Sequence, residues 1–345
     1  MNSSDLACTA CWEGGMKYAL SGLCGFAAAA FVLCFLALMP AAHAGSISAN
    51  TGTYAGDAGG LNFPVGSVAV TNYTAWRKGG AFYDSDGVPD RTGNLHTITN
   101  VARIDWLAAR IGDMPVALSA ALPYGYLDDA ELGGQEVSAQ SSFFSPNVFI
   151  TLGVIADPQN ERTLALSGYV FLPVGSYDSA KTVNIAPPDQ TVLVPQFAYE
   201  EGLGKFAPAL ANFRIDVFGG AAFHSDGDNP ITTGGAGFAR TEQENSYDLN
   251  LYLRYNWNPL AFVAIGIERS WGGEQIATGG ALGALGDVSL GKDDYLKGHL
   301  QFGIPLSDTL QIAADITHDF QREGGFREDF TAEIRVSTFI MAAQK

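Results

Sequence analysis

Much of the chain alternates between apolar and polar residues with a period of two. The clearest stretch is 247–257, "YDLNLYLRYNW", in which every second residue from Tyr247 to Trp257 is apolar or aromatic. Residues 296–304 and 309–319 repeat the pattern. A period of two is that of a β-strand whose two faces meet different surroundings, because successive side chains point to opposite faces. The pattern therefore predicts an all-β protein.

About twelve segments follow this alternation, and their connections predict how they are arranged. The segments are 66–77, 95–107, 114–127, 146–157, 161–173, 191–203, 210–224, 239–257, 259–272, 290–304, 308–320 and 328–341. Tight joins at 109–114, 157–162, 202–210, 256–259 and 305–308 alternate with longer connections at 78–94, 128–145, 174–190, 225–238, 273–289 and 321–327. This alternation is typical of a transmembrane antiparallel up-and-down β-barrel of the outer membrane, with short periplasmic turns and longer external loops. An even strand number places both ends of the barrel in the periplasm.

Tryptophans stand near the predicted strand ends, where such barrels have aromatic girdles. Trp76 and Trp271 lie at the loop ends of their segments, and Trp106 and Trp257 lie at the turn ends. The period alone does not distinguish lipid from a protein core, so a soluble β-sandwich with tryptophans capping its core is the alternative. The alternation of short and long connections favours the barrel.

The N-terminal region predicts export. Residues 16–44 contain a basic Lys17, a long apolar run, Pro40 and a small-x-small site that ends at Ala44. This order is that of a secretory signal peptide cleaved after Ala44, with a single membrane anchor as the rival. Residues 1–15 precede a natural start and are interpreted as an upstream over-extension. Residues 45–65 are Gly- and Ser-rich and are predicted to be a flexible lead-in or plug before the barrel at 66–345.

Cysteine and charge content narrow the function further. Cys8, Cys11, Cys24 and Cys34 all precede the predicted cleavage, and the Cys8-x-x-Cys11 pair lacks the partners of a zinc site. The exported chain would therefore use neither disulfides nor thiol catalysis. The net charge is −17 for the full chain and −16 beyond residue 44, which disfavours nucleic acid as a partner. Charged residues make up only 16%, against roughly 25% in soluble domains.

Short motifs near two strands carry a family resemblance. They are Pro64-x-Gly66 before the first strand, Tyr83-Asp84-x-x-Gly87 after it, and Leu172-Pro173-x-Gly175-x-Tyr177-Asp178 in mid-chain. With these motifs the chain resembles the "MetA-pathway of phenol degradation" family of outer-membrane β-barrel proteins. The resemblance implies an outer-membrane protein linked to the catabolism of aromatic compounds, which helps hydrophobic substrates across. It brings no catalytic residues and no cofactor.

One feature departs from that pattern. Outer-membrane barrels usually end on an aromatic residue, whereas this chain ends "TFIMAAQK", with Phe339 six residues from the terminus. Either the terminal signal is displaced inward along the chain or the last strand ends differently.

The polar phase of the strands predicts which side chains line the lumen. These are Arg103, Asp105, Arg214, Asp216, Asp248, Arg254, Glu268, Lys297, His299, Asp315, Glu333 and Arg335. Both signs of charge are present, so the set is either a structural network that fills a narrow barrel or a polar constriction that selects solutes. On the same reasoning Leu249, Leu251 and Leu253 face lipid. A wet lumen would then tolerate Arg254→Ala.

The sequence gives only weak signals for metal binding or catalysis. Asp84, Asp86 and Asp90 surround Gly87 and resemble half of a calcium loop, and Asp226 and Asp228 form a second acidic turn. Neither has a bidentate Glu at the twelfth position, and solvated Asp-Gly turns are the default. His96, His224 and His318 lie near external strand ends, but no nucleophile motif accompanies them. We therefore expect no enzyme, no catalytic residue, no cofactor and no metal.

The function hypothesis is a bacterial outer-membrane channel for small hydrophobic or aromatic compounds, embedded in outer-membrane lipid and monomeric. The alternative is a barrel that transports nothing and acts at the surface through its acidic loops. A lipid-modifying enzyme of the outer membrane is a third possibility.

Overall fold

The computed structural model describes residues 54–83, 87–90, 93–132, 134–136, 138–175, 183–184, 190–225, 240–258, 260–278, 288–291 and 294–342. The predicted signal peptide (1–44) and the first part of the lead-in (45–53) lie outside these residues.

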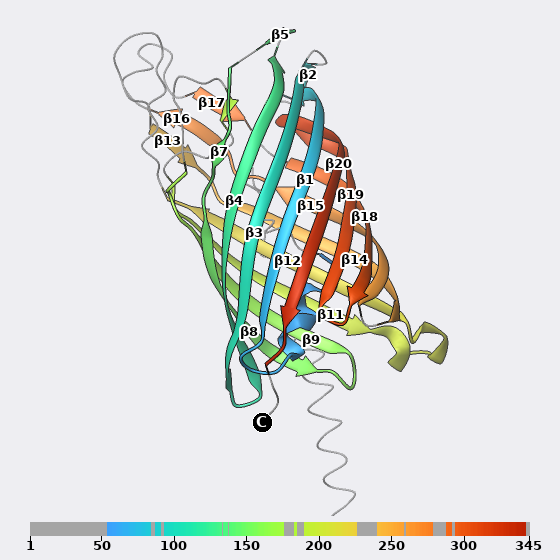
Figure 1. Cartoon of the computed structure of the whole chain (residues 1–345). Coiled ribbons are helices and arrows are strands. Elements are labelled where there is room, and N and C mark those ends of the chain that lie inside the picture. Colours follow the sequence, from blue (N-terminus) through green and yellow to red (C-terminus); the bar gives the residue numbers. More distant parts are fainter. Residues whose placement is uncertain are drawn as a thin grey trace, which may run out of the picture. The chain divides into compact units, whose positions relative to one another are not determined.

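Twelve antiparallel strands form one closed ring (Figure 1). In chain order they are β1 (Val68–Tyr83), β3 (Asn94–Ile111), β4 (Met114–Leu132), β8 (Asn147–Asp157), β9 (Arg162–Phe171), β11 (Val192–Gly202), β12 (Phe213–His224), β14 (Ser246–Asn258), β15 (Ala261–Trp271), β18 (Asp294–Ser307), β19 (Leu310–Glu323) and β20 (Gly325–Ile340). Each strand pairs with its neighbour in the chain, and β1 pairs with both β3 and β20, which closes the ring. The predicted fold class is confirmed.

Burial in the barrel is inverted relative to a soluble protein. Large apolar side chains such as Leu251, Ile265 and Ile334 are more than 40% exposed on the outer surface. Charged side chains such as Asp216, Asp248 and Glu268 are fully buried. An apolar outer band around a polar interior is the pattern of a transmembrane barrel. The soluble β-sandwich is therefore excluded.

The turns gather at one end of the barrel, where the C-terminus also lies (Figure 1). Only two residues separate β3 from β4, and one of them is Gly112 with φ +61°. The longest of these connections holds two short 3₁₀ helices, η2 (Leu203–Lys205) and η3 (Pro208–Leu210). A third, η1 (Asp57–Asn62), precedes β1. No helix in the described part of the chain is long and apolar enough to cross a membrane.

The opposite end carries short additional strands. They are β2 (Pro89–Asp90), β5 (Gln135–Glu136), β6 (Ala139–Gln140), β7 (Ser142–Phe143), β10 (Val183–Asn184), β13 (Arg240–Gln243), β16 (Gln275–Thr278) and β17 (Val288–Gly291). β13, β16 and β17 form a separate three-stranded sheet beyond the barrel. The segment predicted as one strand over 239–257 is thus two strands in different sheets.

Two more boundaries differ from the sequence prediction. β1 continues seven residues past Trp76 to Tyr83, so Trp76 stands within the strand and not at its end. Residues 321–327, predicted as a loop, belong almost wholly to β19 and β20, which only Gly324 separates. Gly324 and Gly325 have φ of +76° and +71°, a backbone that glycine adopts without steric cost.

Candidate functional site

The charged residues predicted to line the lumen occupy inward positions of their strands. Asp216, Asp248, Arg254, Glu268, Lys297, Asp315 and Arg335 are buried, and the His299 side chain is 5% exposed. Arg103, Asp105, Arg214 and Glu333 are half-buried. The structure brings them together in several groups that also recruit residues outside the predicted set.

Arg254 on β14 forms a buried ion pair with Asp216. Its Nε donates to Asp216 Oδ2 at 2.9 Å and its Nη2 donates to Asp216 Oδ1 at 2.8 Å. The same Nη2 lies 3.4 Å from Oε2 of Glu200 on β11. The two-pronged geometry matches a guanidinium to a carboxylate. Because all three side chains are buried, this group crosses three adjacent strands with little contact to water.

Arg103 and Arg214 each lie beside a carboxylate, Arg103 in the middle of β3 and Arg214 at the turn end of β12. Arg103 Nε is 2.9 Å from both oxygens of Asp105, and the Ser119 hydroxyl donates to Asp105 at 2.7 Å. The Arg103 guanidinium also stacks 4.9 Å from the centre of the Phe149 ring. Arg214 pairs with Glu161, a turn residue.

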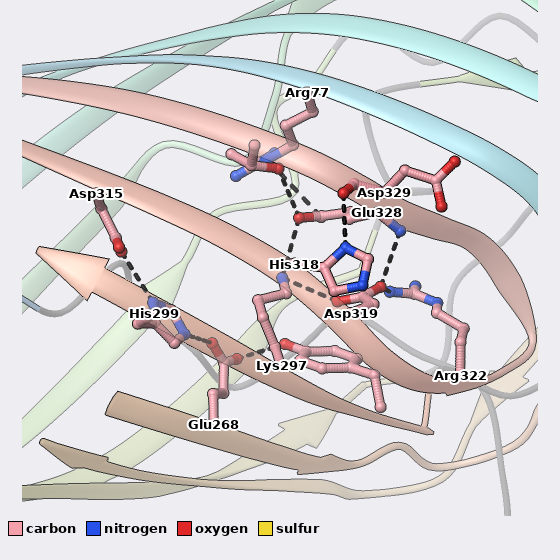
Figure 2. A network of polar contacts seen from close by, with 12 residues as sticks. Arg77, Glu268, Lys297, His299, Asp315, His318, Asp319, Arg322, Glu328 and Asp329 are labelled. Carbon is pink, nitrogen blue, oxygen red and sulfur yellow. Dashed lines mark hydrogen bonds and ion pairs between the residues drawn. The ribbon is translucent and has the colours of Figure 1, made fainter. Parts of the chain in front are cut away.

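His299 on β18 stands between two carboxylates (Figure 2). Its Nδ1 is 2.9 Å from Asp315 Oδ2 and its Nε2 is 3.0 Å from Glu268 Oε2. The other Glu268 oxygen accepts from the Tyr295 hydroxyl at 2.5 Å. A doubly protonated imidazolium can donate both hydrogen bonds, which would neutralise one of the two buried negative charges.

Lys297 belongs to a second group shown in Figure 2, toward the external end of β18 to β20. Its Nζ lies 3.1 Å from Glu328 Oε2 and 3.9 Å from Asp319 Oδ1. Asp319 also pairs with Arg322 at 3.1 Å, and Glu328 with Arg77 at 3.8 Å. The group therefore links positive and negative side chains of β18, β19, β20 and β1.

The lead-in enters the barrel interior. Tyr54 and Ala55 are each 1% exposed. The Ala55 amide donates to Gln301 Oε1 at 2.9 Å, Asp57 pairs with Arg335, and the Arg335 guanidinium covers the Tyr54 ring at 4.2 Å. These contacts place Tyr54, Ala55 and Asp57 among inward-facing side chains of the barrel.

Phe339 points inward and packs edge-on against Phe63, with ring centroids 5.5 Å apart. Phe339 is thus the last inward-facing side chain of β20 and contacts the lead-in, whereas the next residue, Ile340, is exposed on the outer surface.

A cavity of about 420 Å³ lies beside the lead-in, toward the turn end of the barrel. Aromatic rings form much of its wall, including Phe149, Tyr169, Phe218 and Phe262. Arg103, Arg214, Arg254 and Arg335 also border it, each paired with a carboxylate. The volume is in the range of small-molecule sites, roughly 300–1,000 Å³.

Sequence reasoning missed several members of these groups. Glu200 and Asp319 share the inward phase of their strands, so a stricter reading of the alternation would have found them. Asp57 had no such signal, because the lead-in has no strand period.

The remaining candidates divide between described and undescribed residues. Asp84 and Asp86 of the calcium candidate, the turn at 226–230, and motif residues Tyr177 and Asp178 lie outside the described residues. Motif residues Pro64, Gly66, Tyr83, Leu172, Pro173 and Gly175 all flank or end barrel strands. His96 lies 3.4 Å from Asp129, and His318 Nδ1 lies 2.6 Å from the Asp329 carbonyl oxygen. No described cluster of three or more His, Cys, Asp or Glu could hold a metal ion.

Known structures share this architecture. The chain is similar to the COG4313 outer membrane channel from Pseudomonas putida F1, with 20% identity, a TM-score of 0.71, and coverage of 84% of this chain and 100% of that chain. It is also similar to a deltaS2 mutant of the TodX monoaromatic hydrocarbon channel, with 11% identity, a TM-score of 0.46, and coverage of 80% and 89%. The first likeness shows a shared barrel fold. No curated protein matches the chain.

A family model described as "Putative MetA-pathway of phenol degradation" matches residues 78–331, well over half of the chain. The matched range contains ten complete barrel strands, from β3 to β19, and parts of β1 and β20. It also contains most of the interior charge groups and the motif residues Leu172, Pro173 and Gly175. The chain therefore belongs to this phenol-degradation family, as its motifs predicted.

Proposed function

We propose that the protein is a bacterial outer-membrane channel that passes small, neutral aromatic molecules. The observation that carries the proposal is the 420 Å³ cavity inside a closed barrel, lined by aromatic rings and by arginines most of which are paired with an acid. The family description, which names phenol degradation, supports an aromatic solute.

The barrel exterior supports a membrane location. Its exposed side chains include Val70, Ile104, Leu251, Ile265 and Ile334, all from strands that also bury polar residues on the other face. A continuous apolar band would aggregate in water but is solvated by lipid acyl chains. A monomer is sufficient for this arrangement, because the ring of strands leaves no edge to be covered.

The cavity chemistry supports a neutral solute. A charged solute would need an unpaired group of opposite sign, and most arginines of the wall, including Arg103, Arg254 and Arg335, already have acidic partners. Aromatic walls offer offset and edge-on contacts to a planar ring, and such contacts contribute about 0.5–1.5 kcal/mol each beyond burial. A phenol-like molecule would combine these contacts with one hydrogen bond.

The test compares bulky substitutions at two adjacent residues of β1 that face opposite ways. Ala69 lines the cavity, whereas Val70 is 46% exposed on the outer surface. We expect cells that produce the wild type to take up radiolabelled phenol faster than cells without the protein. Ala69→Trp should remove most of that gain, and Val70→Trp should keep it. Heat-modifiable gel migration would check that both variants fold.

Equal uptake with and without the wild-type protein would contradict the channel proposal and favour a surface role. Slower uptake for Val70→Trp but not for Ala69→Trp would place the solute path outside this cavity.

A further inference from the structure

A carboxylate without a cationic partner is buried on β14. Asp248 is 0% exposed, and its Oδ2 accepts from Asn250 Nδ2 at 3.1 Å. Among the described residues, its Oδ1 has no hydrogen-bond partner and its carboxylate forms no ion pair. The contrast is with Asp216 and Asp315, whose charges face Arg254 and His299.

Two more oxygen atoms without partners lie on the same inner patch. The register places Asp248 opposite Ser270 on β15 and opposite Gly220 on β12, with Asn250 one inward position further along. Within the described part of the chain, Asn250 Oδ1 and Ser270 Oγ have no hydrogen-bond partner, and both residues are 0% exposed. Directly opposite side chains on paired strands are about 4.5–5.5 Å apart at Cβ, close enough for one small ligand to reach both.

Gly220 leaves space beside the free carboxylate oxygen. A Cβ atom added at this glycine would lie 2.9 Å from Asp248 Oδ1. Any larger residue at this position would therefore crowd that oxygen.

Glu268 does not compensate Asp248. It lies opposite Asn250, but Tyr295 and His299 already engage its two oxygens. An isolated buried carboxylate is strongly disfavoured, so a positive charge, a proton or water must reach it. The three free atoms are all acceptor oxygens, and hard metal cations prefer such ligands.

We propose that Asp248, Asn250 and Ser270 bind a small monovalent metal cation such as Na⁺ within the barrel wall. One carboxylate supplies one negative charge, which a monovalent ion neutralises. Divalent ions usually gather several carboxylates, which this patch lacks. The site is separate from the aromatic cavity, so it stands whether or not the channel proposal holds.

The test measures how the stability of the purified, folded barrel depends on the cation. The midpoint of heat-induced unfolding is followed by gel migration in sodium chloride and in N-methyl-D-glucamine chloride at equal ionic strength. A bound ion stabilises the folded state in proportion to the logarithm of its concentration above Kd. We expect the wild-type midpoint to rise with sodium and not with the large organic cation.

Three variants assign the effect to this patch. Asp248→Asn keeps the shape and removes the charge, so its midpoint should be the same in both salts. Gly220→Ala should lose the sodium effect because its methyl group occupies the ligand position, and Ser270→Ala should need more sodium for the same shift. The matched control is Gly168→Ala on β9, where an added Cβ meets nothing within 4 Å, and it should keep the full sodium effect.

A wild-type midpoint that is equal in both salts would overturn the proposal and leave Asp248 neutralised by a proton or water. A sodium effect that persists in Asp248→Asn would place the ion elsewhere. If Asp248→Asn does not fold, Gly220→Ala and Ser270→Ala decide, since both keep the carboxylate, and an unchanged sodium effect in both would also overturn the proposal.

Discussion

Single charged side chains in this barrel depend on their partners more than on water. The sequence predicts that Arg254 lines a wet lumen, in which water would replace a lost charge. In the structure the Arg254 side chain is instead enclosed by other side chains. Only 6% of its side chain is exposed, and Asp216 and Glu200 surround it. Removing the guanidinium would leave two buried carboxylates facing each other.

We therefore expect Arg254→Ala to destabilise the barrel by roughly 3–5 kcal/mol, the usual cost of breaking a buried ion pair on one side. The midpoint of urea-induced unfolding would report it. Arg110→Ala is the matched control, because Arg110 is exposed and donates to the Asp113 carbonyl oxygen at 3.0 Å. If Arg254→Ala unfolds at the same urea concentration as the control, water reaches the two carboxylates more readily than their burial in the structure indicates.

On the outer face, the loss of folding stability caused by a charged residue should depend on how deep in the bilayer that residue lies. Leu251 lies in the middle of β14 and is 43% exposed, so Leu251→Arg should cost roughly 2–4 kcal/mol. Leu306 is also on the outer face but next to the turn end of β18, where the same change should cost about 0–1 kcal/mol. The yield of folded protein in lipid vesicles would compare the two variants. An equal loss of yield at both positions would argue against a membrane-spanning apolar band.

At the scale of strands, alternation was sufficient to predict the whole ring. All twelve barrel strands and the inward phase of residues such as Asp248 and Glu268 follow from a period of two. The alternation could not show where a strand leaves its sheet. Arg240 to Gln243 keep the strand pattern but pair with β16 beyond the barrel. It also could not show the interior lead-in, whose contacts from Tyr54 and Asp57 follow tertiary packing and have no local period.

The lead-in is the element whose removal should change transport most. Deleting residues 54–61 would free the space that Tyr54, Ala55 and Leu61 fill, so we expect a higher single-channel conductance in planar bilayers. Arg335→Gln is a milder variant that removes the partner of Asp57 and leaves the segment in the chain. Arg335→Gln should show brief openings to the conductance level of the deletion. An unchanged conductance in the deletion itself would mean that the segment does not limit the solute path.

At the scale of the whole molecule, the sequence predicts export and trimming. Protein extracted from outer membranes should begin at Gly45, because the small-x-small site ends at Ala44. N-terminal sequencing checks this directly, and a sequence that starts at Met1 or Met16 would refute it. Replacing Ala44 by a bulky residue should block trimming at this site.

The contacts of the lead-in have a consequence for the order of assembly. Closing the ring requires β1 to meet β20, the pairing with the greatest separation along the chain and therefore the slowest to find. Arg335 and Phe339, which hold the lead-in, are on the closing strand β20. We therefore expect the last contacts of the N-terminal segment to form together with the β1–β20 seam, which would couple its docking to completion of the barrel.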